Sequence, residues 1–139
     1  MDMDMPSKGR SDLYASVTCL FYYLITYSDE RVDQIEVSLK DKIAAIEKFN
    51  MSHFEQQFLI YNQNDRATVF NKCITDLKEL EHFEQIQILA WMFVVADSDD
   101  DFNGKEWSVI QDALNILDLS LSQILITERN LNKLLMRKY

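Results

Sequence analysis

A chain of 139 residues, 47% of them hydrophobic, is long enough to fold as one domain around one apolar core. Its net charge of −9 disfavours nucleic acid and anionic membrane surfaces as partners, because phosphate groups attract positive charge, and favours cations or basic protein surfaces. Only two Gly and one Pro occur, which is few for the turns of a β-rich protein, so long helices joined by short polar loops are expected.

The ends and the cysteines give a first view of organisation and location. Segment 1–10 is polar and lacks the apolar stretch of a signal peptide, so we expect a disordered tail there and a single domain over 11–139. Cys19 and Cys73 have no CxxC spacing and are expected to be buried thiols in a reducing compartment. The sequence has no run of about 18 apolar residues. These features predict a cytoplasmic protein without membrane insertion.

Apolar residues recur at helical spacing along the whole chain, which predicts an all-α fold, a compact bundle of about seven helices. The expected helices cover about 11–27, 34–49, 52–61, 65–80, 83–96, 103–117 and 120–137. The first and fifth are the most apolar and are expected at the centre. Capping-box patterns stand at the start of four of them, at 33–36, 52–55, 103–106 and 120–123.

The sequence also contains an internal repeat. At a shift of 70 residues, segment 29–36 (DERVDQIE) falls on segment 99–106 (DDDFNGKE). Segment 49–52 matches 117–120 at a shift of 68, so one copy is expected to have lost about half a turn in its second helix. We expect two pseudo-symmetric units of helix, acidic loop and helix. The helices ending near Tyr27 and Ala96 should lie side by side, related by a pseudo-two-fold axis.

The two acidic loops are candidate cation sites. Helix capping explains Asp33, Asn103, Glu36 and Glu106 without any ligand. Capping does not explain the other loop carboxylates, which repel one another. A hard cation such as Ca²⁺, Mg²⁺ or Mn²⁺ would reduce this repulsion. The plainer alternative is a solvated acidic face. The candidate metal ligands are Asp29, Glu30, Glu36, Asp97, Asp99, Asp101 and Glu106.

The sequence does not support a calcium-binding EF-hand, a zinc site or a known catalytic motif. Segment 99–104 (DDDFNG) contains the first half of a calcium-loop signature, but position 12 is Ile110 and not a bidentate Glu. His53 and His82 are expected to be exposed or capping, because a zinc site needs more nitrogen or sulfur ligands. No nucleophile elbow, phosphate loop or dinucleotide fingerprint is present, so we expect a protein that is not an enzyme and holds no organic cofactor.

The pattern resembles the TerB-like family of tellurite-resistance proteins, whose domain also occurs at the N-terminus of certain membrane-anchored J-domain co-chaperones. The resemblance covers roughly 12–135. It is carried by 29–32 (DERV) with Glu36, by Ala96-Asp97, and by the closing turns 49–52 (FNMS) and 117–120 (LDLS). Glu30 replaces the usual loop Gly, and Asn50 and Asp118 replace the Gly of the turns. The second loop is about two residues longer than the family pattern.

The resemblance implies an all-helical fold with two related halves and acidic loops close together at one end. It also implies a role in metal or stress response, with divalent cations bound through the loop acids. The function we expect is therefore a non-enzymatic accessory domain that binds divalent cations and an unknown protein partner. The alternative is a metal-independent protein-interaction or scaffold module.

Overall fold

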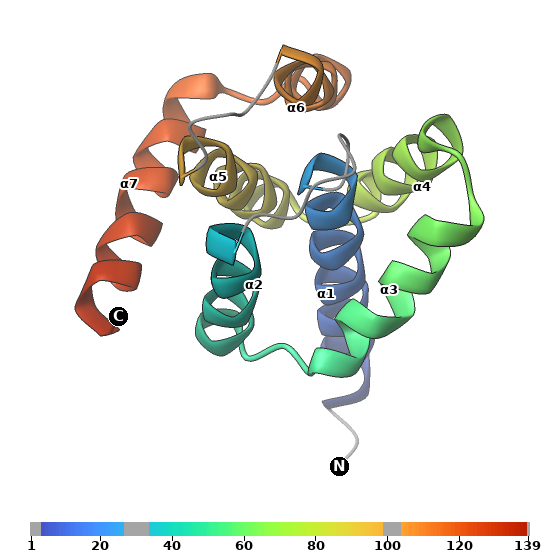
Figure 1. Ribbon diagram of the computed structural model, residues 1–139, viewed down its shortest axis with the longest axis horizontal. Coiled ribbons are helices and arrows are strands. Elements are labelled where there is room, and N and C mark those ends of the chain that lie inside the picture. The colour runs from blue at the N-terminus through green and yellow to red at the C-terminus, as the bar shows by residue number, and fades with distance from the viewer. Residues whose placement is uncertain (1–3, 27–33, 99–103, 139) are drawn as a thin grey trace.

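The computed structural model describes residues 4–26, 34–98 and 104–138, and their side chains over 12–26, 39–97 and 107–136. This part of the chain forms seven α-helices and no strand, which confirms the predicted all-α fold (Figure 1). The helices are α1 Asp4–Thr26, α2 Gln34–Glu47, α3 Met51–Gln63, α4 Arg66–Lys78, α5 His82–Ser98, α6 Gly104–Leu117 and α7 Leu121–Lys138.

Helix α1 begins earlier than the sequence pattern indicated. It starts at Asp4, whereas the apolar stripe suggested a start near Ser11. The boundary between a tail over 1–10 and a domain over 11–139 therefore stays a prediction. Within the described ranges, no helix is long and apolar enough to cross a membrane.

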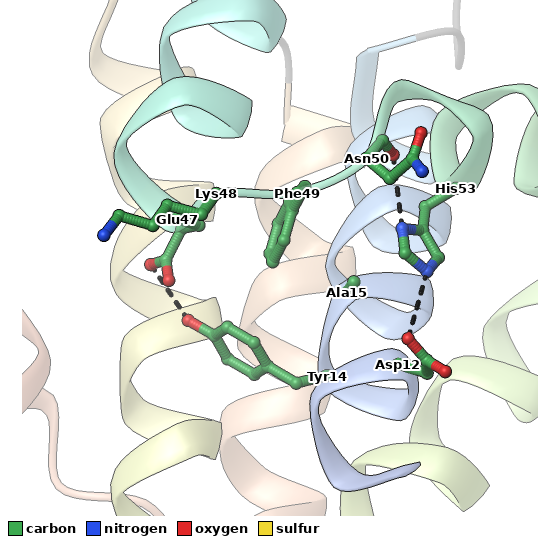
Figure 2. Close-up of a pocket in the computed structure, with 8 residues that line it drawn as sticks. All are labelled: Asp12, Tyr14, Ala15, Glu47, Lys48, Phe49, Asn50 and His53. Carbon is green, nitrogen blue, oxygen red and sulfur yellow. Dashed lines mark hydrogen bonds and ion pairs between the residues drawn. The ribbon is translucent and has the colours of Figure 1, made fainter. Parts of the chain in front are cut away.

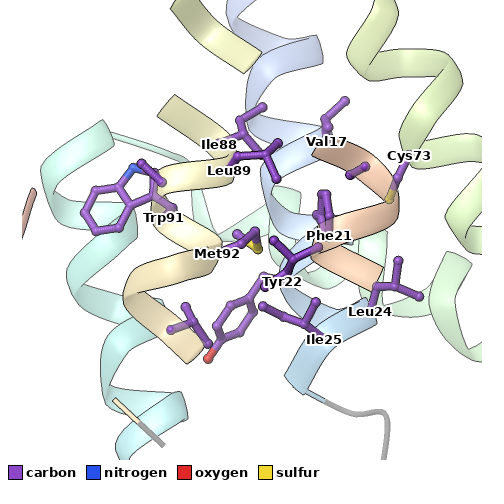
Figure 3. Close-up of a cluster of buried hydrophobic side chains, with 14 of the residues drawn as sticks. Val17, Phe21, Tyr22, Leu24, Ile25, Cys73, Ile88, Leu89, Trp91 and Met92 are labelled. Carbon is purple, nitrogen blue, oxygen red and sulfur yellow. The ribbon is translucent and has the colours of Figure 1, made fainter. Parts of the chain in front are cut away.

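Helices α1 and α5 form the centre of the bundle and pack against each other, as expected for the two most apolar segments. Every residue from 17 to 26 and from 88 to 96 is buried. Figure 3 shows side chains of both helices in the space between them, among them Tyr22 from α1 and Met92 from α5. Burial on all sides removes any solvent-facing stripe, so both helices require a complete shell of neighbours.

Amphipathic helices supply that shell (Figure 1). Helix α3 packs along α1 and α7 along α5, while α2 contacts α5 and α6 contacts α1. The α1–α3 interface is aromatic: the ring of Tyr23 lies 5.1 Å from that of Phe58 and 6.1 Å from that of Phe54. Edge-to-face rings at these distances add specific packing to the apolar burial. The ring of Tyr23 thus contributes to the packing of α1 against α3.

Polar side chains fix the helix ends. The Arg66 guanidinium, at the start of α4, donates to the Leu24 carbonyl oxygen at 2.9 Å and so places positive charge near the C-terminal end of α1. Gln85 is buried in α5, and its amide donates to the Leu77 carbonyl oxygen of α4 at 2.8 Å. The first bond joins α4 to α1, and the second joins α5 to α4. Both satisfy carbonyl groups that helix ends leave unpaired.

The observed N-caps agree only in part with the capping boxes read from the sequence. Helix α7 has the expected Ser120 cap, whose Oγ accepts from the Gln123 amide at 3.4 Å. In α3 the cap is Asn50, not Ser52, because the Asn50 side chain accepts from the Ser52 amide. The boxes at 33–36 and 103–106 lie outside the described side chains.

Helices α2 and α6 have the same length, so the predicted loss of half a turn in one copy of the repeat was wrong. Helices α2 and α6 both have 14 residues, and their bounds differ by 70 at each end. Each ends in the same backbone turn: Lys48 and Asp118 have φ of 62° and 54°, and the amides of Phe49 and Leu119 donate to carbonyls five residues earlier. Sequence similarity had placed Asn50 opposite Asp118, but backbone conformation places Lys48 there. The pseudo-two-fold axis itself stays a prediction.

These two left-handed positions lead to a stability prediction. Lys48 and Asp118 are exposed, so Lys48→Gly and Asp118→Gly should each raise the free energy of unfolding by about 0.5–1 kcal/mol, because Gly adopts positive φ without a Cβ clash. Glu79→Gly, at the end of α4 where φ is −81°, is the matched control and should bring no gain. Urea unfolding measures all three. A loss of stability in either turn variant would contradict the assignment of the turns.

Candidate functional site

The structure describes only a small part of the predicted cation site. Asp29, Glu30, Asp99 and Asp101 lie outside the described residues, and Glu36 and Glu106 stand in the first turns of α2 and α6 with side chains outside them. Asp97, near the end of α5, is the one candidate ligand whose side chain is described. Within the described ranges, no group of three or more His, Cys, Asp or Glu side chains is placed to hold a metal ion.

Asp97 has a partner that sequence reasoning missed. Glu128 of α7 is 7% exposed and shares a hydrogen bond with Asp97, which is exposed. Burial, the hydrogen bond with Asp97 and the negative charge of Asp97 together raise the pKa of Glu128 to about 8. The raised pKa favours the protonated form of Glu128 at neutral pH. Asp97, the first residue of the second acidic stretch, therefore lies against a buried carboxyl group.

Glu128 stands where an apolar residue is expected. Ile124 and Leu131, one turn before and one turn after it on the same face of α7, are buried core residues. An acidic residue within such a stripe is the signal that could have found it, because burial of a lone carboxylate is costly unless it is partnered.

A second carboxylate centre lies at the opposite end of α2 from the first acidic loop, at Glu47. Its Oε2 atom accepts three hydrogen bonds: from the Tyr14 hydroxyl of α1 at 3.0 Å, and from Gln87 Nε2 and Trp91 Nε1 of α5 at 2.8 and 2.6 Å. One oxygen atom thus joins three helices. Trp91 is fully buried in the core, and its indole N–H donates to this carboxylate.

The Glu47 position carries the same signal as Glu128. Leu39 and Ile43, eight and four residues earlier in α2, are buried, so Glu47 continues their face toward α5. Burial and the nearby Glu47 carboxylate raise the pKa of the Tyr14 hydroxyl above its ordinary value, so the phenol stays protonated and donates.

Glu47 also lines a pocket of about 510 Å³ between α1, the end of α2 and the start of α3 (Figure 2). On its other side His53 Nε2 lies 3.5 Å from Asp12 Oδ1, and His53 Nδ1 lies 3.2 Å from the Asn50 carbonyl oxygen. The pocket is lined by Asp12, Tyr14, Ala15, Glu47, Lys48, Phe49, Asn50 and His53.

The two histidines and the two cysteines are the remaining residues about which the sequence led to an expectation. His82 is exposed at the start of α5, as expected, whereas His53 is partly buried and bridges α1 and α3. Cys19 and Cys73 are buried free thiols, and burial raises the pKa of both, which disfavours the reactive thiolate.

The fold and these two carboxylate centres define an acidic, all-α domain built around two central helices with long buried stretches. Residues 15–127, more than half of the chain, match the family described as tellurite resistance protein TerB. The chain belongs to this family, as the resemblance of its loops and turns indicated. Searches of curated proteins and of solved structures found no match.

The Asp97–Glu128 pair predicts how stability depends on pH. The folded-state pKa of Glu128, about 8, lies above its ordinary value of 4.5, so the folded state binds more protons between these values. The free energy of unfolding should therefore fall as pH rises from about 4.5 to about 8. Glu128→Gln keeps a hydrogen-bonding group but does not titrate. It should flatten this dependence and stabilise the protein at pH 8 by about 1 kcal/mol, a value discounted because Asp97 is exposed.

Urea unfolding at a series of pH values in chelator-treated buffer measures this effect. Glu55→Gln, which removes an exposed carboxylate from α3, is the control and should keep the slope of the unmodified protein. Parallel pH profiles for the unmodified protein and Glu128→Gln would contradict the raised pKa of Glu128.

Proposed function

We propose that this protein is a non-enzymatic TerB-like accessory domain that binds a divalent cation through its acidic interhelical loops, in a metal or stress response. The second loop is the principal site in this proposal, with Asp97, Asp99, Asp101 and Glu106 as candidate ligands and Glu128 as an additional one. The first loop contributes Asp29, Glu30 and Glu36.

One observation carries the proposal: a buried carboxyl group, Glu128, is held against Asp97, and no basic side chain among the described residues pairs with either. A divalent cation in place of the Glu128 proton would relieve the repulsion of the two carboxylates. Hard carboxylate oxygens suit Ca²⁺, Mg²⁺ or Mn²⁺. Asp99 and Asp101 follow within four residues of Asp97, so their backbone positions lie no more than about 14 Å away.

The two loops should differ in affinity. The second stretch holds four acids between Asp97 and Asp101, whereas the first holds Asp29 and Glu30 next to Arg31. More uncompensated charge means a larger gain from a cation, so the second loop should bind first. Affinity should be modest, because the bidentate Glu that completes a calcium-binding helix-loop-helix is missing.

A second candidate function, a metal-independent protein-interaction module, is favoured by apolar side chains on the surface. Phe83 and Ile126 are 67% and 59% exposed and line a shallow groove of about 320 Å³ between α5 and α7. Exposed apolar groups of this size commonly mark contact surfaces. Further exposed apolar residues of α7 are Leu121, Leu125, Leu134 and Met136.

Thermal unfolding and calorimetry with Ca²⁺, Mg²⁺ and Mn²⁺ separate these functions. At a cation concentration of about 100 times the dissociation constant, we expect the midpoint to rise by about 5 °C or more. The triple variant Asp97→Asn, Asp99→Asn, Asp101→Asn should lose this rise and the binding heat. Glu128→Gln should weaken binding, and at neutral pH it should reduce the number of protons released by the cation.

A matched triple variant shows that the effect depends on position and not on net charge. Glu55→Gln, Glu79→Gln and Asp112→Asn remove three exposed acids from other helices and should keep the cation response. A response that survives the loop substitutions would place the site elsewhere. Absence of heat and of a midpoint shift in the unmodified protein would leave the interaction module as the function.

A further inference from the structure

We propose that the pocket between α1, the end of α2 and the start of α3 binds an organic cation, an ammonium or guanidinium group carried by a small amine or by a Lys or Arg side chain. This inference is independent of the metal proposal. The pocket lies at Glu47, the last residue of α2, whereas the first acidic loop precedes the other end of that helix, about 20 Å away along its axis.

The charge of Glu47 is held in place but not neutralised. All three of its hydrogen-bond donors, Tyr14, Gln87 and Trp91, are uncharged, and all reach the same oxygen, Oε2. No donor among the described residues reaches Oε1, and no basic side chain among them forms an ion pair with Glu47. A carboxylate whose orientation is fixed on one oxygen keeps the lone pairs of the other for a charged donor, which is the stronger type of hydrogen bond.

The adjacent lysine does not supply that donor. Lys48 follows Glu47 directly, but its positive φ turns the chain, and Figure 2 shows its side chain directed away from Asp12 and His53. The pocket therefore keeps a net negative charge in a chain that is already at −9.

The other pocket walls suit a cation with an apolar stem. Asp12 supplies a second carboxylate, 62% exposed at the rim. The rings of Tyr14 and Phe49 lie 5.7 Å apart in an edge-to-face arrangement and provide an aromatic surface. A guanidinium or ammonium group is attracted to aromatic faces, and its methylene stem packs against apolar walls such as Ala15. The volume of about 510 Å³ is ample for one such group.

Other ligand classes fit less well. An anion would face two carboxylates, and a neutral ligand would leave the Glu47 charge without a partner. A metal ion needs at least three close ligands, and the described part of the chain places no such group here. The shared chemistry that remains is a single positive charge with planar or tetrahedral N–H donors.

Residue-resolved NMR with butylguanidinium as the probe tests the pocket directly. We expect saturable amide shifts at Tyr14, Phe49, Asn50 and His53. Butylurea, a neutral compound of nearly the same shape, should not produce them. The peptide acetyl-Gly-Arg-Gly-amide, compared with its citrulline analogue, identifies the source: tighter binding of the peptide than of butylguanidinium indicates a protein side chain, and equal binding indicates a small cation.

Three variants make the test specific. Glu47→Gln keeps an acceptor for the three donors but removes the charge, so butylguanidinium should bind about tenfold more weakly. Asp12→Asn, at an exposed rim position that carries little risk to folding, should weaken binding to a smaller extent. Asp112→Asn on α6 changes the net charge equally and should have no effect. Equal binding of butylguanidinium and butylurea, no saturable shifts at the pocket, or equal weakening by Asp112→Asn would overturn the proposal.

Discussion

The burial on every side of residues 17–26 of α1 and 88–96 of α5 is the constraint on which the rest of this structure depends. A helix with no polar face cannot lie at a surface, so each needs neighbours around its whole circumference. The chain meets this need with α3 and α4 packed on α1 and α7 packed along α5, while α2 contacts α5 and α6 contacts both central helices. Helices α2 and α6 thus tie the two halves of the sequence together.

Burial on all sides also decides which polar groups the centre can hold. The hydroxyls of Thr18 and Thr26 are buried in α1 and donate to the carbonyl oxygens of Tyr14 and Tyr22, four residues earlier. Within the described residues, no buried side-chain nitrogen or oxygen is left without a hydrogen-bond partner. Against this fully hydrogen-bonded interior, the two carboxyl groups at its edge, Glu47 and Glu128, stand out. Each occupies a position that an apolar residue could fill.

The two carboxyl groups have different surroundings, and these surroundings give them different chemistry. Glu47 is surrounded by uncharged donors, which fix the direction of its carboxylate. Glu128 is set against another carboxylate, which favours its protonated form. In our proposals, the first arrangement presents a fixed negative charge to an organic cation, and the second brings a proton and a divalent cation into competition at Asp97 and Glu128.

Much of the fold followed from the sequence, because helical periodicity and scarce Gly and Pro are strong local signals. The central pair, the seven helices and the family were predicted correctly. The register of the repeat was not, because Lys48 at positive φ has no sequence signature comparable to Gly. The contact between Asp97 and Glu128 was not predicted, since contact between α5 and α7 depends on packing and not on spacing along the chain.

The central claim is that Asp97 and Glu128 belong to a cation site, and anomalous scattering from crystals grown with Mn²⁺ tests it most directly. The account predicts an anomalous peak within about 2.6 Å of carboxylate oxygens of both residues, with further oxygens from the 99–106 segment. Ordered crystals in which these two carboxyl groups still contact each other, with no peak beside them or with a peak only elsewhere, would contradict it.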